Sequence, residues 1–294
     1  MAGHTHDGLD WSARIAEMWR AQALEGGALR GVAERLAAGL AAGATVVDVG
    51  CGTGGMSAAL AGALRGRGGG QMVLVDAVPE LLEVAAGAAT RAGANQVEVR
   101  TVRADAASEE MLDLVPVADL VWASRVLHHL PDQRRGAELL ARLLAPGGWL
   151  ALAEGGLERR CLPWDVGVGR PGLQDRLLAA RAAWFEAMRA GIPGSVRLTQ
   201  GWNRVLAELG LGSVTAFSYL VDHPAPPSAA VRESVTDWLT MVADTAADHL
   251  DADDREAVRR LLDPHDPAWI GARDDVFVLQ AHTVHLGRAE PETA

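Results

Sequence analysis

The chain has 294 residues, enough for one large core that carries appended or inserted segments. Hydrophobic residues make up 49% of it and charged residues 22%, a balance that excludes an intrinsically disordered chain. With 27 basic and 38 acidic residues the formal net charge is −11, and no cluster of arginines marks a phosphate-binding stripe. We therefore expect neither a nucleic-acid partner nor an anionic membrane surface.

The chain carries two cysteines, Cys51 and Cys161, which can form neither a disulfide framework nor a four-cysteine metal site. The most apolar early run, residues 36–47, is too short to cross a bilayer. We expect a protein of the reducing cytoplasm, present as a monomer or a homodimer.

Hydrophobic periodicity predicts two amphipathic helices first, at residues 9–25 and 28–42. Short β-branched strands then alternate with helices of about ten residues or more. The expected strands are 45–49, 72–75, 97–102, 119–123 and 149–153, and the expected helices between them are 56–65, 81–92 and 132–144. Such alternation is typical of βαβ units, so we predict an α/β fold with a parallel sheet covered on both faces.

The alternation of strands and helices ends after Glu154, where prolines and glycines become frequent. The predicted division is an N-terminal helical segment (1–44), a core (45–154), an inserted cap (155–195), the core continued (196–222), a helical insertion (223–272), and a last core strand with a tail (273–294). We expect the N-terminal helices and the helical insertions to form a lid over the core.

The most informative segment is the glycine turn after the first predicted strand. Gly50, Gly52 and Gly54 alternate there behind Asp48, and a helix comes next. Glycines at alternate positions permit positive φ and leave no Cβ, so a ligand can lie against the backbone at the carboxyl end of the strand. The segment predicts a cofactor cradle.

Three acidic residues indicate which cofactor the cradle holds, because Gly50, Gly52 and Gly55 alone also satisfy the dinucleotide fingerprint. Asp48 suits a cationic ligand group better than a pyrophosphate. Asp76 ends the second predicted strand, 76 − 50 = 26 residues after the first glycine, where a carboxylate can accept from both hydroxyls of a ribose. Asp105, after the third strand, can accept from an adenine amine. A cationic amino acid, a ribose and an adenine together describe S-adenosylmethionine.

Residues 48–54 resemble the first motif of class I S-adenosylmethionine-dependent methyltransferases, and residues 104–106 resemble their adenine motif. Residues 119–132 are similar to the fourth-strand segment of the small-molecule, natural-product or quinone-type branch, and residues 144–148 match the turn before strand five. The resemblance implies a Rossmann-like, mostly parallel sheet of seven strands, with the last inserted antiparallel between strands five and six. The implied cofactor-binding residues are Asp48, Gly50, Gly52, Gly54, Asp76, Ala77, Asp105, Ala106 and Ser124.

The sequence lacks signatures of two other methyltransferase branches, and this limits the reactions that we expect. The fourth strand is not followed by the Asn/Asp-Pro-Pro-aromatic signature of enzymes that methylate nucleic-acid amines, and Asp119 lies at the wrong end of its strand for a catechol-type metal site. We therefore expect metal-free, in-line methyl transfer to a small-molecule acceptor, expected to be a secondary metabolite, with S-adenosylhomocysteine as product. Two alternatives stay open: a binding protein in which methyl transfer is lost or redirected, and an NAD(P)-dependent oxidoreductase.

His128 and His129 come after the fourth strand, where the methyl group should lie, and are the candidate general bases. His129 is favoured because Leu130 and the Pro131-Asp132 helix start should turn it back toward the sheet, although both rings could merely shape the pocket. The candidate substrate-binding residues are Arg125, Trp11, Trp164 and Trp184.

Overall fold

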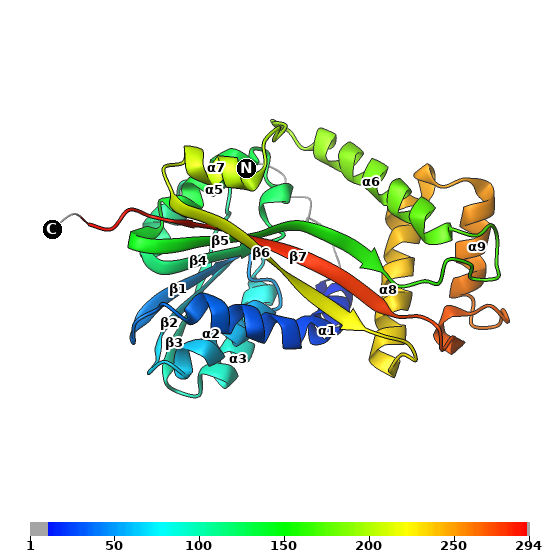
Figure 1. The fold of residues 1–294 in the computed structure, drawn as a ribbon, viewed down its shortest axis with the longest axis horizontal. Helices are drawn as coiled ribbons and strands as arrows, with labels where there is room; N and C mark the ends of the chain where they lie inside the picture. Colours follow the sequence, from blue (N-terminus) through cyan, green and yellow to red (C-terminus); the bar gives the residue numbers. More distant parts are fainter. Residues whose placement is uncertain (1–10, 293–294) are drawn as a thin grey trace.

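The computed structural model describes residues 11–292, with side chains described from residue 15 onward. Its centre is a seven-stranded sheet in the order β3-β2-β1-β4-β5-β7-β6 (Figure 1). The strands are β1 (Ala44–Val49), β2 (Gly70–Asp76), β3 (Val97–Arg103), β4 (Ala118–Ser124), β5 (Leu144–Arg160), β6 (Gly212–His223) and β7 (Val278–Arg288). β7 runs antiparallel between β5 and β6, whereas β1 to β5 are parallel. The predicted α/β class is confirmed, as is the predicted antiparallel placement of the last strand between strands five and six.

Helices cover both faces of the sheet (Figure 1). α1 (Trp11–Ala37), α2 (Gly55–Arg65) and α3 (Pro79–Gly93) pack on one face, and α4 (Met111–Leu114), α5 (Gln133–Ala141) and α7 (Trp202–Glu208) on the other. Neighbouring strand residues such as Val46 and Val47 enter opposite cores, and both are fully buried. A sheet buried on both faces needs near-continuous apolar strands, which explains the β-branched runs in the sequence.

A separate group of helices lies beyond the carboxyl ends of the parallel strands. This helical subdomain consists of α6 (Leu173–Gly191), α8 (Ala229–Ala246) and α9 (Ala252–Leu262), and it rests on the long ends of β5, β6 and β7 (Figure 1). Leu177, Val235 and Leu261 are fully buried in its own apolar core. Within residues 11–292 there are also three short turns of 3₁₀ helix: η1 (Leu127–His129), η2 (Ala247–His249) and η3 (Ile270–Ala272). In the part of the chain that the structure describes, no helix is both long and apolar enough to cross a membrane.

The N-terminal segment differs from its prediction, because α1 is one continuous helix and not two. Gly26 and Gly27 lie in its middle, where each glycine costs about 1 kcal/mol relative to alanine. Tertiary packing outweighs that cost. Leu29 and Val32 are buried against the sheet core, while Leu24 packs against the helical subdomain, so the helix is held on both sides of the glycine pair.

The fifth strand also differs from its prediction, since it continues to Arg160 where an inserted cap was expected from residue 155. Gly155 and Gly156 adopt positive φ and mark an irregularity, but pairing with β7 resumes at once, with Gly156 opposite His282 and Leu157 opposite Ala281. A bulge of this kind bends a strand without ending it. The longer β5 and β7 thereby carry the helical subdomain out over the carboxyl edge of the sheet.

Candidate functional site

The glycine turn leaves β1 at Gly50 and enters α2 after Gly54. The Gly50 N–H donates to the carbonyl of Val75 in β2 over 2.7 Å, which fixes the start of the turn. Gly50 has φ +67°, and a Cβ there would lie 2.3 Å from a methyl group of Val126; Gly54 has φ +82°, and its Cβ would lie 2.5 Å from the Cα of Ala85. Both positions therefore require glycine, and the turn is held tightly between β2, α3 and the segment after β4.

Asp76, at the carboxyl end of β2, accepts a hydrogen bond from the backbone of the glycine turn. One carboxylate oxygen accepts from the Gly52 N–H over 3.0 Å, and the other accepts from the Val78 N–H over 3.0 Å. The acid predicted to bind a ribose thus lies against the glycine turn. It holds the backbone there with charge-assisted hydrogen bonds, the stronger class of hydrogen bond.

Asp48 lies beneath the turn, with 2% of its surface exposed. Its carboxylate accepts from the Ser57 hydroxyl over 2.5 Å and so ties β1 to the first turn of α2. Burial raises the pKa of Asp48 to about 7, against the opposing effect of the Ser57 hydrogen bond and with a contribution from the charge of Asp76. Burial also raises the pKa of the neighbouring Cys51 thiol, so that thiol stays protonated and is not a nucleophile.

The pKa of Asp48 predicts that folded-state stability decreases as the pH rises from about 4 to about 7. An unfolded chain loses this proton near its ordinary pKa of 3.8, whereas the folded chain retains it up to about pH 7, so the folded state binds more protons across the interval. Asp48→Asn can still accept from Ser57 and should flatten this part of the profile. Urea unfolding between pH 4 and pH 8 measures the effect, with the exposed Asp248→Asn as control. A profile parallel to the parent's would contradict the assignment.

The remaining predicted cofactor residues lie at the same edge of the sheet. Asp105 comes after β3 and accepts from the Ala107 N–H over 2.9 Å; Ala77 is next to Asp76, and its carbonyl accepts from Arg103. Ser124 is the last residue of β4. Because parallel strands end at one edge, the fold brings all nine predicted cofactor residues to it, Ala106 included.

Helix α1 lies across the glycine turn, and its contacts could not be found from any motif. The Thr53 hydroxyl donates to the side-chain carbonyl of Gln22 over 2.6 Å. A Cβ on Gly55 would lie 1.6 Å from the Gln22 amide nitrogen, and a Cβ on Gly52 would lie 3.2 Å from the Met18 terminal methyl. α1 therefore covers the turn, as the predicted lid requires.

His128 is oriented by a buried carboxylate. Its Nδ1 lies 2.8 Å from one oxygen of Glu154, and the other oxygen of Glu154 accepts from the N–H groups of Val126 (2.9 Å) and Leu127 (2.8 Å). Glu154 is 5% exposed. A carboxylate can only accept, so in the neutral imidazole the proton lies on Nδ1 and the lone pair on Nε2.

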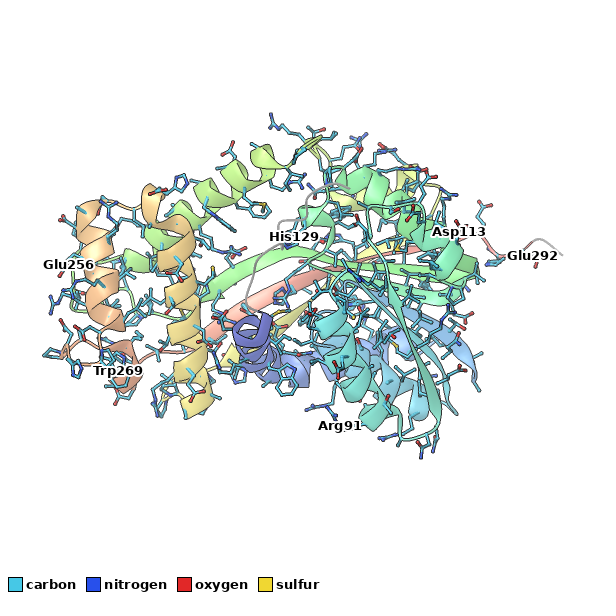
Figure 2. All side chains as sticks on the ribbon, turned by 180° about the vertical axis from the view of Figure 1, so that it is seen from behind. Arg91, Asp113, His129, Glu256, Trp269 and Glu292 are labelled. Carbon is cyan, nitrogen blue, oxygen red and sulfur yellow. The ribbon has the colours of Figure 1, made fainter. Side chains whose placement is uncertain are left out.

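His129, the base that the sequence favoured, is exposed and is labelled in Figure 2. Its ring lies against that of His128, with centroids 4.2 Å apart. The Glu154 carboxylate orients the imidazole of His128, and this contact makes His128 a candidate base alongside His129. The contact between Glu154 and His128 cannot be predicted from local sequence, because it forms only through the pairing of β4 with β5.

Arg189 of α6 fixes the loop that carries both histidines. Its guanidinium donates to the carbonyls of His128 (2.9 Å), Leu130 and Pro131 (3.3 Å). Burial lowers the pKa of Arg189. The Phe185 ring, also on α6, meets the His128 ring edge-on at 5.6 Å. The helical subdomain thus holds the loop after β4, a contact between distant segments that no local pattern signals.

Arg125 lies at the end of β4 with φ +57°, in the left-handed region that arginine seldom adopts. One guanidinium nitrogen lies 3.5 Å from the carboxylate of Glu25 on α1. Burial alone would raise the pKa of Glu25, but the charge of Arg125, together with His282 and Arg159, lowers it to about 2. The predicted substrate residue Arg125 therefore lies at the site edge, beside a permanently ionised buried acid.

The predicted tryptophans are not gathered at this edge. Trp164 is 72% exposed and lines a separate groove of about 270 Å³ with Leu162 and Phe277. Trp184 packs against the core of the helical subdomain, and the side chain of Trp11 lies outside the described residues. Trp164 and Trp184 thus do not assemble the expected aromatic lining, because an irregular segment exposes Trp164 and α6 packs Trp184 against the subdomain core.

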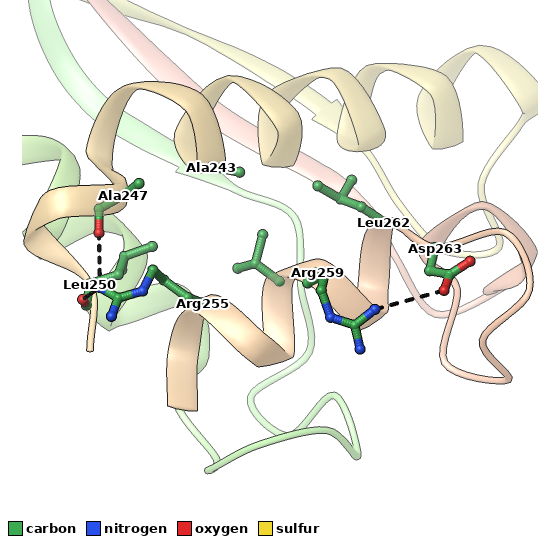
Figure 3. Close-up of a pocket in the computed structure, with 8 residues that line it drawn as sticks. Ala243, Ala247, Leu250, Arg255, Arg259, Leu262 and Asp263 are labelled. Carbon is green, nitrogen blue, oxygen red and sulfur yellow. Dashed lines mark hydrogen bonds and ion pairs between the residues drawn. The ribbon is translucent and has the colours of Figure 1, made fainter. Parts of the chain in front are cut away.

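A larger groove, of about 530 Å³, lies between α8 and α9 (Figure 3). Its lining is mostly apolar, and its two arginines already have partners: Arg255 donates to the carbonyls of Ala247 and Leu250, and Arg259 pairs with Glu256 and Asp263. None of the predicted site residues lines it. Over the described residues, no group of three His, Cys, Asp or Glu side chains is arranged to hold a metal ion.

Comparison with known proteins agrees with this geometry. Residues 47–150 match the family model described as a methyltransferase domain. The ubiquinone biosynthesis O-methyltransferase of Paracidovorax citrulli is 35% identical over 109 residues, which are 37% of this chain and 42% of that protein. Its counterpart in Xylella fastidiosa is 38% identical over 109 residues, 37% of this chain and 40% of that protein.

Among solved structures, the YcgJ protein of Bacillus subtilis shares the fold, with a TM-score of 0.50 and 20% identity over 89% of this chain and 98% of that one. The chain spans about two fifths of the length of the curated relatives it matches. These findings confirm, over residues 47–150, the resemblance drawn from the motifs. The helical subdomain lies outside the matched segment.

Proposed function

We propose that the chain binds S-adenosylmethionine at the glycine turn and catalyses transfer of its methyl group to a hydroxyl oxygen of a small-molecule acceptor. The observation that carries the proposal is the hydrogen bond from the Gly52 N–H to the Asp76 carboxylate. Through this contact the acid that would bind the ribose lies against a turn whose positions 50 and 54 admit only glycine. The methyltransferase domain match over residues 47–150 favours this cofactor over a nicotinamide dinucleotide.

The residues at the sheet edge fit the cofactor part by part. Asp76 would accept from the ribose hydroxyls and Asp105 from the adenine amine, while the turn around Gly52 leaves its backbone accessible to the amino-acid portion. The cofactor supplies an electrophilic methyl group on a sulfonium. The buried, partly protonated Asp48 lies below the turn and can lend negative charge toward the cationic end of the ligand.

His128 would take the acceptor proton. Glu154 keeps the Nε2 lone pair available and stabilises the imidazolium that forms when Nε2 accepts a proton from the hydroxyl. The oxygen that has lost its proton would receive the methyl group that the bound cofactor supplies, which would give a methyl ether and S-adenosylhomocysteine. α1 over the turn and α6 over the loop after β4 hold the reactants and exclude water.

The hydroxyl acceptor is supported by two observations. An imidazole oriented by a carboxylate is useful where a proton must leave, as it must from a hydroxyl group. The curated relatives are named O-methyltransferases of ubiquinone biosynthesis, which supports oxygen as the methyl-accepting atom here. We propose that the acceptor here is a hydroxylated secondary metabolite and that transfer needs no metal ion.

Ligand binding should stabilise the folded chain measurably. A ligand that binds only the native state contributes about 2.7 kcal/mol at a hundred times its dissociation constant. Thermal unfolding with S-adenosylmethionine, S-adenosylhomocysteine or NAD⁺ should therefore show an upward shift of Tm with the first two alone. A shift with NAD⁺ only would indicate the oxidoreductase. Binding of both sulfur ligands without formation of S-adenosylhomocysteine from any acceptor would indicate a binding protein.

A further inference from the structure

A cluster of charged side chains lies where α1, the end of β4, β5, β7 and α8 meet, and the proposed methyl transfer does not use it. At its centre is Glu25, which is buried on α1. Gln280 of β7 donates to one oxygen of Glu25 over 2.9 Å, and the Nε2 of His282 lies 3.6 Å from the same oxygen. The pKa of about 2 keeps Glu25 ionised near neutral pH.

Two further arginines of this cluster, Arg159 and Arg20, are held by partners on other elements. Arg159 of β5 donates to Gln280 and to Ser234 of α8, and Arg20 of α1 forms a two-pronged pair with Asp237 of α8 at 2.6 and 3.0 Å. The charges of Glu17 and Glu233 also act on Arg20, so the three guanidinium groups of the cluster are offset by carboxylates.

Arg125 is the cation of this cluster that can meet a ligand. Its side chain is 56% exposed, whereas that of its partner Glu25 is 4% exposed. A guanidinium carries five N–H donors. The contact with Glu25 at 3.5 Å involves one of its nitrogens, so the N–H groups on the other nitrogens can donate to a ligand. The other two arginines are already committed to Asp237, Gln280 and Ser234.

The backbone places Arg125 between the two halves of the proposed reaction. Its N–H donates to the Ala153 carbonyl over 3.1 Å, and the strained φ of +57° turns the chain out of β4 at this residue. The next residue, Val126, packs on Gly50 of the glycine turn, and His128 comes two residues later. Left-handed backbone at a non-glycine residue persists where the surroundings enforce it, and it is typical of functional positions.

We infer that Arg125 binds a carboxylate on the acceptor, so that the substrate is a hydroxylated carboxylic acid. Glu25 is a positioning residue, which holds the guanidinium at the site edge without contacting the substrate. The inference rests on the proposed function, because it is the methyl acceptor that Arg125 would hold with its hydroxyl toward His128.

The test compares an acid with its neutral ester. Isothermal titration of the chain saturated with S-adenosylhomocysteine should show 3,4-dihydroxybenzoate binding roughly tenfold or more tightly than methyl 3,4-dihydroxybenzoate. Arg125→Gln should abolish that preference, and Arg125→Lys should retain part of it, because a lysine keeps the charge but lacks the five N–H donors of a guanidinium. Arg204→Gln, an exposed arginine on α7 paired with Glu208, should leave the preference unchanged.

Equal affinity for acid and ester in the parent, including failure of both to bind, would overturn the inference, as would an acid preference that survives in Arg125→Gln. Affinity for S-adenosylhomocysteine is measured first in every variant. Unchanged cofactor affinity shows that Arg125→Gln is folded, so its loss of acid preference supports the inference. Failure of the parent to bind S-adenosylhomocysteine overturns the proposed function instead.

Discussion

His128→Ala should lower turnover of a hydroxyl acceptor at neutral pH by about 10²–10⁴-fold, the range for loss of a general base. His129→Ala should keep turnover within about threefold of the parent, well below that range. The difference is due to Glu154, whose carboxylate lies 2.8 Å from Nδ1 of His128. Single-turnover kinetics with saturating S-adenosylmethionine measures the effect on the chemical step.

Two further measurements distinguish a catalytic role of His128 from a structural role. Both alanine variants should bind S-adenosylhomocysteine as the parent does, so that a loss of turnover in His128→Ala reports on the chemical step. Glu154→Gln keeps an amide oxygen for the Val126 and Leu127 N–H groups but removes the charge, so it should lower turnover while preserving the loop. If both histidine variants retain turnover within about threefold, catalysis depends on positioning alone.

Asp76→Ala should weaken binding of S-adenosylmethionine at least tenfold. The carboxylate is expected to accept from two ribose hydroxyls, and charge-assisted hydrogen bonds contribute roughly 1.5 to 3 kcal/mol each. It also holds the Gly52 and Val78 N–H groups, so its loss loosens the turn itself.

Asp119→Asn is the matched control for Asp76. This residue also accepts from a backbone N–H, that of Thr45 over 2.8 Å, but at the opposite edge of the sheet. Its replacement should leave cofactor affinity intact. Unchanged affinity in Asp76→Ala, measured by titration calorimetry, would rule out the ribose assignment.

The sheet could be predicted from sequence because β1, β2, β4 and β5 contain apolar runs bounded by polar or glycine residues, whereas β3 alternates apolar and polar residues, and strand ends locate the acids. Asp48, Asp76 and Asp105 are found by that rule alone. The errors occurred where tertiary contacts override local preference. Gly26 and Gly27 do not break α1, because buried residues on both sides hold it. Residues 155–160 continue β5, because β7 pairs with them.

The candidate site was predictable on its cofactor side and less so on its acceptor side. Glycine spacing fixes the turn, whereas Gln22, Glu25 and Arg189 act through contacts with residues 31 to 100 positions away along the chain. Such contacts leave no local pattern. Glu154 was visible only as the residue after a strand, and its role depends on β4 and β5 being neighbours in the sheet.

Incubation with S-adenosylmethionine labelled by a trideuteromethyl group tests the central claim most directly. The chain would be supplied with a metabolite extract and with 3,4-dihydroxybenzoate, and products would be identified by mass spectrometry. The account predicts S-adenosylhomocysteine together with an equal amount of a trideuteromethyl ether, both greatly reduced in His128→Ala. Binding of the cofactor without transfer of the label to any acceptor would contradict it.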